Sequence, residues 1–217
     1  MVKFWHLSYN FFMKRIFITL IIICAALTSS CYGFTFPNKK NEVQEQTDVK
    51  SQQARVLYAQ NDIDGALKIL SKKAEEERTA QDWLIIGNIM QDKEKINEAV
   101  YMFSQSVNKD PKFYKAHYNL GYIYLSQNKP NMAITEFKQV VKYKPDFSYG
   151  YYNMGCAYLK LNKYSTAKYY FFKALDLKAN EPDVYYNLAY TFKMLGKEKQ
   201  AQSYLDLYNK MMESHEL

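Results

Sequence analysis

The sequence is poor in residues that interrupt helices, with only 7 glycines and 5 prolines among its 217 residues. Because glycine and proline mark turns and loops, their scarcity disfavours a loop-rich sheet protein. Hydrophobic residues instead make up 48% of the chain and aromatic residues 17%, which is ample for a packed core. We therefore expect a globular helical protein with one large domain or two small ones.

Cysteine and histidine are also scarce, with three of each. Cys24, Cys31 and Cys156 form no C-x-x-C pair and have no histidine at ligand spacing, so they indicate neither a zinc site nor a redox motif. Paired carboxylates, a Ser/His pair and a Gly-rich phosphate loop are lacking as well. The sequence therefore predicts a protein that is not an enzyme and has no metal, no cofactor and no small-molecule substrate.

Basic charge is not concentrated enough to indicate nucleic-acid binding. The formal net charge is +7, but Lys3, Lys14 and Arg15 lie in the first thirty positions, where there is no Asp or Glu. The rest of the chain therefore carries +4, which is ordinary for a domain of this size. We expect no nucleic-acid partner.

The N-terminal region has the three-part layout of a signal peptide. An apolar run from Ile16 to Leu27 follows Lys14 and Arg15 and precedes the small residues 28–30. Twelve helical residues span about 18 Å, which is short of the roughly 30 Å of a bilayer core. We predict that residues 1–33 are a signal peptide and that the protein is exported. Translation is expected to start at Met13, which opens a conventional charged region before the apolar run.

Two processing routes remain open for this leader. In the first, Cys31 is lipidated, because the residues before it resemble a bacterial lipobox, although Thr28 stands where an aliphatic residue is usual. In the second, an ordinary signal peptidase cuts before Phe34. Residues 34–46 are polar after their first few positions, lack an apolar period and suit a short tether.

The remainder of the chain is repetitive. Alanines recur at intervals of 33, 34, 34 and 34 residues, namely Ala66, Ala99, Ala133, Ala167 and Ala201. The best-formed unit, residues 114–147, carries six residues of a recognisable motif at its positions 7, 8, 11, 20, 24 and 32: Leu120, Gly121, Tyr124, Ala133, Phe137 and Pro145.

That spacing resembles the tetratricopeptide repeat family. The resemblance implies an all-α fold, a right-handed α-solenoid of about five helix-turn-helix repeats within residues 47–217. Gly at position 8 and Ala at position 20 let the two helices of a unit approach closely. The predicted repeats are residues 47–79, 80–113, 114–147, 148–181 and 182–215.

The resemblance also assigns residues to a concave groove, because positions 2, 5, 6, 9, 12 and 13 of each first helix line it in this family. Regularly spaced amides could pair with the main chain of an extended peptide, and tyrosines offer apolar area with few rotatable bonds. The alternative is that these residues support neighbouring helices. The predicted partner-binding residues are Asn88, Tyr118, Asn119, Tyr122, Tyr152, Asn153, Tyr186, Asn187 and Tyr190.

Together these features predict a non-catalytic protein-protein interaction scaffold of the bacterial cell envelope, periplasmic or anchored as a lipoprotein. Its partner is expected to be another envelope protein, with lipid-mediated membrane attachment if Cys31 is lipidated. Two alternatives stay open: an adaptor subunit for cell-wall enzymes, and a cytoplasmic RNA-binding helical array. Export separates the last of these from the others.

Overall fold

The computed structural model describes residues 39–177 and 182–215, with side chains from residue 49 to residue 213 within those ranges. The described residues form ten α-helices and one short 3-10 helix, with no strand among them. The α-helices are α2 (Lys39–Ala59), α3 (Ile63–Ser71), α4 (Ala80–Asp92), α5 (Ile96–Lys109), α6 (Tyr114–Ser126), α7 (Pro130–Tyr143), α8 (Ser148–Lys160), α9 (Tyr164–Asp176), α10 (Pro182–Met194) and α11 (Glu198–His215). The 3-10 helix η1 spans Glu75–Glu77.

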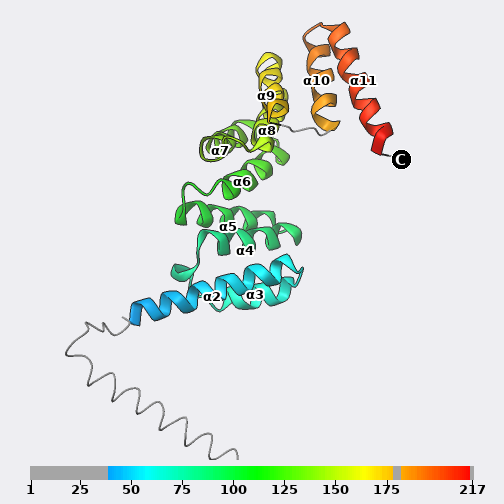
Figure 1. Ribbon diagram of the computed structural model, residues 1–217. Coiled ribbons are helices and arrows are strands. Elements are labelled where there is room, and N and C mark those ends of the chain that lie inside the picture. The colour runs from blue at the N-terminus through cyan, green and yellow to red at the C-terminus, as the bar shows by residue number, and fades with distance from the viewer. Residues whose placement is uncertain (1–38, 178–181, 216–217) are drawn as a thin grey trace, which may run out of the picture. The chain divides into compact units, whose positions relative to one another are not determined.

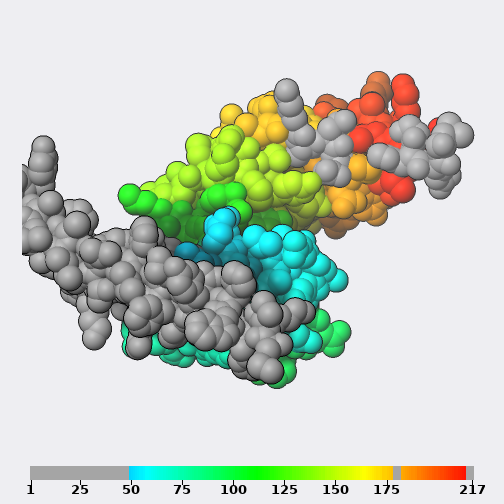
Figure 2. Space-filling view, turned by 60° about the horizontal axis from the view of Figure 1, so that its bottom comes forward, coloured from blue at the N-terminus to red at the C-terminus, as the bar shows by residue number. Residues whose placement is uncertain are grey.

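The helices after Gln46 form a stack of hairpins, and the predicted all-α solenoid is confirmed. Within a hairpin α4 packs against α5, α6 against α7, α8 against α9 and α10 against α11. Between hairpins α5 packs against α6, α7 against α8 and α9 against α10, in the chain order that Figure 1 shows. In the space-filling view the colours from yellow-green through orange to red follow one another in the same order (Figure 2).

The turn inside each hairpin repeats the same backbone geometry. The fifteenth residue of each repeat lies in this turn and has a positive φ, between 57° and 70°. The next N–H reaches back five residues to a carbonyl, as when Lys129 donates to Tyr124 at 2.8 Å. This is the hydrogen bond of a Schellman motif, which closes the first helix and turns the chain. The residues with positive φ are Asn61, Glu94, Asn128, Asn162 and Gly196.

A glycine in the first helix makes room for a phenylalanine from the second. A Cβ atom placed on Gly121 would lie 2.6 Å from Cε1 of Phe137, which is too close for a real contact. The predicted close approach of the two helices is therefore present at position 8, where the glycine faces the ring at position 24. The pairs are Gly87–Phe103, Gly121–Phe137 and Gly155–Phe171, and the last repeat has Ala189 and Leu205 at these positions.

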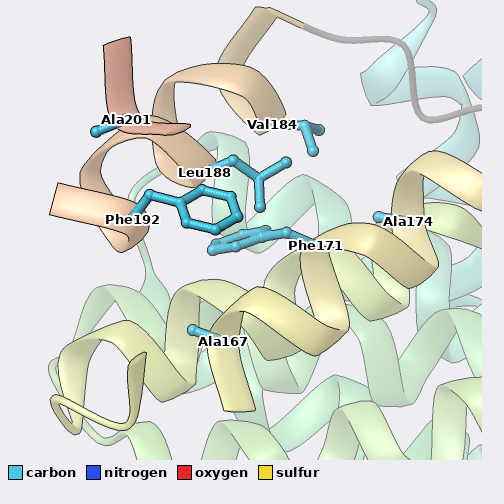
Figure 3. Packing of buried hydrophobic residues seen from close by; sticks show 7 residues of the cluster. All are labelled: Ala167, Phe171, Ala174, Val184, Leu188, Phe192 and Ala201. Atoms are coloured by element: carbon cyan, nitrogen blue, oxygen red, sulfur yellow. The ribbon is translucent and has the colours of Figure 1, made fainter. Parts of the chain in front are cut away.

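Successive hairpins meet through equivalent residues. The first helix of each pair presents its positions 3, 7 and 10 to positions 20, 24 and 27 of the pair before it. Figure 3 shows this for the fourth and fifth pairs, where Val184 and Leu188 of α10 lie against Phe171 and Ala174 of α9. All four side chains are buried, and burial of each large one contributes about 1.5–3 kcal/mol.

The first pair begins earlier than predicted. Helix α2 starts at Lys39, so residues 39–46 of the predicted tether are helical. The apolar period that would reveal a helix is missing there, because Val43 is the one apolar residue among residues 39–46. The predicted signal peptide, residues 1–33 with Met13 and Cys31, lies outside the described residues. Among the helices that are described, none is both long and apolar enough to cross a membrane.

Candidate protein-binding groove

The exposed face of the first helices carries the residues predicted to bind a partner. Tyr122, Tyr186 and Tyr190 are the most open of them, at 50%, 52% and 45% exposure. Asn153 is buried, and the other five predicted residues are half-buried: Asn88, Tyr118, Asn119, Tyr152 and Asn187. The structure therefore divides the predicted set into an exposed tyrosine layer and a floor beneath it.

The floor is tied together by hydrogen bonds between repeats. Nδ2 of Asn153 donates to the phenol oxygen of Tyr118 at 3.3 Å. One repeat later, Nδ2 of Asn187 donates to the phenol oxygen of Tyr152 at 3.0 Å. An asparagine at position 6 thus binds the tyrosine at position 5 of the preceding repeat, and the pattern recurs with the period of the fold.

The hydrogen bond between repeats has a different acceptor where the tyrosine at position 5 is missing. Leu84 occupies position 5 of the second repeat, and Nδ2 of Asn119 donates instead to Oδ1 of Asn88 at 2.8 Å. Amides that hold neighbouring helices have fewer atoms to offer to a bound main chain. Within the predicted set, the asparagines therefore support the packing of neighbouring repeats.

Burial keeps the floor phenols and the nearby thiol uncharged. It raises the pKa of Tyr118 and of Tyr152 above the ordinary value of 10.0. It also raises the pKa of the Cys156 thiol to about 11. A protonated thiol is a poor nucleophile, and no group of three metal-binding side chains exists within the described part of the chain. The floor is neutral and supplies hydrogen bonds and apolar area.

A hollow of about 320 Å³ opens at the N-terminal half of the groove. Phe147, the last residue of the third repeat, forms part of its wall and packs edge-on against Tyr118, with ring centroids 5.2 Å apart. Six of the nine lining residues are not among the predicted binding residues. Two of the six, Gln81 and Lys115, stand at groove position 2, so their positions in the repeat could have revealed them. The lining residues are Tyr58, Gln81, Leu84, Asn88, Tyr114, Lys115, Tyr118, Asn119 and Phe147.

His117 lies outside the groove, in a packed position between helices. It is buried, with Nδ1 2.7 Å from Oε2 of Glu136 and Nε2 3.0 Å from the carbonyl oxygen of Pro111. Burial lowers its pKa, but these two hydrogen bonds together with the nearby charges of Glu136 and Asp110 outweigh burial and leave the pKa above 6.5. The ring therefore joins α6, α7 and the connection before α6.

Three family models for tetratricopeptide repeats match four stretches of the chain. One matches residues 102–135, a second residues 121–162, and a third matches twice, at residues 148–181 and 182–211. These stretches begin within the second predicted repeat and run through the fifth.

Solved structures with the same fold include MamA proteins. MamA from Desulfovibrio magneticus RS-1 is 18% identical, with a TM-score of 0.68 over 82% of this chain and 98% of that one. A second crystal structure of MamA is 19% identical, with a TM-score of 0.67 over 78% of this chain and 93% of that one. No curated protein matches. Identity this low shows a shared fold, and together with the family models it establishes that the chain is built from tetratricopeptide repeats, which those models place between residues 102 and 211.

Proposed function

We propose that the chain is a non-catalytic scaffold that binds a segment of another protein in its groove. The observation that carries this proposal is the row of exposed tyrosines, Tyr122, Tyr186 and Tyr190, above a floor that inter-repeat hydrogen bonds hold in place. Large exposed aromatic side chains on a rigid support are the usual anchors of protein interfaces. Because the support is already ordered, binding costs little conformational entropy.

The hollow beside Tyr118 suits an apolar anchor side chain from the partner. Its volume of about 320 Å³ lies at the lower end of the roughly 300–1,000 Å³ of small-molecule sites, which fits one large side chain. Leu84, Tyr114 and Phe147 supply apolar walls, while Gln81 and Lys115 supply polar atoms. The bound segment is therefore expected to insert an aliphatic or aromatic residue here and to lay further apolar residues along the tyrosines.

The test compares two pairs of tyrosine substitutions in proteins recovered from cross-linked cell envelopes. Tyr122→Ala with Tyr190→Ala removes groove tyrosines, whereas Tyr101→Ala with Tyr169→Ala removes two equally exposed tyrosines from the second helices α5 and α9. Loss of a tyrosine anchor costs about 2 kcal/mol or more of binding free energy. Recovery of the partner by the groove variant should therefore fall at least about tenfold. Circular dichroism checks that both variants fold. Equal recovery of the same partner by both would contradict groove binding.

We also propose that the scaffold works in the cell envelope after export, with Cys31 as the lipid-bearing residue. The signal-peptide layout of residues 1–33 and the small residues before Cys31 support this proposal. Metabolic labelling with a fatty acid should mark the wild type and leave Cys31→Ser unlabelled. If neither protein is labelled, the lipid anchor is ruled out. If the protein in spheroplasts resists added protease, export is ruled out.

A further inference from the structure

The contacts between repeats define what kind of helix fits on the end of a hairpin. At position 3, the first helices of the third to fifth repeats carry a buried Ala116, Gly150 or Val184. At position 7 they carry buried Leu120, Met154 or Leu188, and at position 10 buried Ile123, Ala157 or Thr191. We call the surface that receives such a helix, formed by positions 20, 24 and 27 of the preceding repeat, the seat. The helix that it receives has small or aliphatic residues at positions 3 and 10.

Helix α2 has this pattern and does not bury it. Val49 and Val56 stand at positions 3 and 10 of the first repeat and are 63% and 47% exposed. Gln53, at position 7 between them, is also exposed. We call this the leading face.

Helices α10 and α11 carry the complementary seat at the other end of the stack. Ala201, Leu205 and Tyr208 stand at positions 20, 24 and 27, where Ala167, Phe171 and Ala174 hold α10 in the preceding repeat. A hollow of about 260 Å³ lies here. We call this the trailing face, and the hollow is lined by Tyr186, Ala189, Tyr190, Lys193, Glu198, Ala201, Gln202 and Leu205.

The last repeat differs from the second to fourth repeats at the pair beside this hollow. Leu205 stands where those repeats have a phenylalanine, and Ala189 stands where they have the glycine that faces that ring. The hollow leaves room for aliphatic side chains from a helix that packs here. A valine at position 3 and another at position 10 supply aliphatic volume on one face of the helix.

We propose that the leading face of one copy binds the trailing face of another, so that α2 continues the stack as the next first helix. The occupant is a second copy because α2 presents the residue pattern that the seat receives three times inside this chain. The contact joins two different surfaces, so each copy retains one face for the next, and association is open rather than closed. Gln53 stands at position 7, where the first helices inside the stack have Leu120, Met154 or Leu188. The contact between two copies is therefore weaker than the contact between two repeats of one chain, and it is reversible.

Sedimentation of the purified protein over a range of concentrations tests the joint. The wild type should show a mass that grows with concentration without stopping at a fixed number of copies. Val49→Glu with Val56→Glu blocks the leading face, and Leu205→Glu blocks the trailing face; each should weaken association by at least about tenfold. Met132→Glu with Tyr169→Glu adds the same charge at exposed apolar residues on α7 and α9 and should leave association unchanged.

Mixing the two blocked variants distinguishes this joint from any symmetric dimer. Each retains one intact face, so an equal mixture should form dimers and nothing larger. A wild type that stays monomeric at its highest soluble concentration overturns the proposal, as does a mixture that forms no dimer or association that neither variant weakens. If Leu205→Glu unfolds, Gln202→Arg at the exposed rim of the same hollow takes its place.

Discussion

Glu94 holds a backbone conformation that its side chain disfavours. Its φ is 59°, in the left-handed region, where the equivalent turns use Asn61, Asn128, Asn162 or Gly196. Outside glycine and asparagine this conformation costs about 1–2 kcal/mol. Replacing Glu94 by asparagine should therefore stabilise the protein by about 0.5–1 kcal/mol, measured as the free energy of unfolding in urea.

The matched control for this change is Glu94→Gln. Glutamine removes the same negative charge but keeps a long side chain at the left-handed position, so it should give little stabilisation. If both variants gain equally, the benefit comes from charge rather than from the backbone.

The fit between Gly121 and Phe137 is also a property of single residues. Gly121→Ala would place a Cβ 2.6 Å from Cε1 of Phe137, and overpacking of this kind costs about 1–3 kcal/mol. Phe137→Leu alone should cost a similar amount, because it leaves a gap in a fully buried site. The double variant reproduces Ala189 and Leu205 of the last repeat, so it should lose clearly less than the sum of the two single losses.

A double-mutant cycle measures this coupling, with each free energy of unfolding taken from denaturant titration. Residues in contact commonly show interaction energies of about 0.5–3 kcal/mol. Strict additivity would mean that the alanine and the ring do not compete for the same space, and would contradict the packing described for positions 8 and 24.

Between elements, His117 joins helices through both of its ring nitrogens. A neutral imidazole has one N–H and cannot donate to both Glu136 and the carbonyl of Pro111, whereas an imidazolium can. Asp110 adds to the raised pKa. Because the folded pKa is raised above 6.5, the contribution to stability is full below pH 6.5 and is lost as the pH rises through the folded pKa.

The change that exposes this dependence is Glu136→Gln. Between about pH 5 and pH 6, where carboxylates are still ionised, it should destabilise the protein by roughly 1 kcal/mol. The difference from wild type should narrow in alkaline solution. Glu98→Gln, at an exposed glutamate of α5, should show no such trend. A difference that stays constant or widens with pH would show that His117 is neutral throughout.

At the level of elements, much of the fold could be predicted from the sequence, because Ala66 to Ala201 set the register and each helix pair follows from it. The early start of α2 could not, since residues 39–46 are almost all polar and carry no apolar period. The exposed tyrosines of the groove could be predicted from their positions in the repeat alone. Support of neighbouring helices by Asn153 and Asn187 was one of two alternatives that the sequence left open. The sequence could not decide between them, because a hydrogen bond between repeats depends on distances that a linear pattern does not contain.

In the whole stack each repeat contacts only its neighbours, so stability is close to a sum of local terms. The joint between the first and second repeats differs from the others because it contains a buried ion pair beside its apolar contacts. Lys73 at position 27 pairs with Asp82 at position 3 across a distance of 2.5 Å, and both side chains are buried. Ser51 of α2 donates to the same carboxylate oxygen at 2.8 Å, so the cluster fixes α2 and α3 against α4.

Lys73→Met should therefore loosen one end of the stack and leave the rest intact. Removing one partner of a buried pair costs about 3–5 kcal/mol, because the carboxylate of Asp82 remains buried without its counter-charge. In a nearest-neighbour array this loss stays local, so hydrogen exchange should speed up in α2 and α3 and change little from α6 to α10. Lys72→Met, at the exposed neighbour, should alter neither region. A uniform loss of protection along the chain would instead show that the stack unfolds as a single cooperative unit.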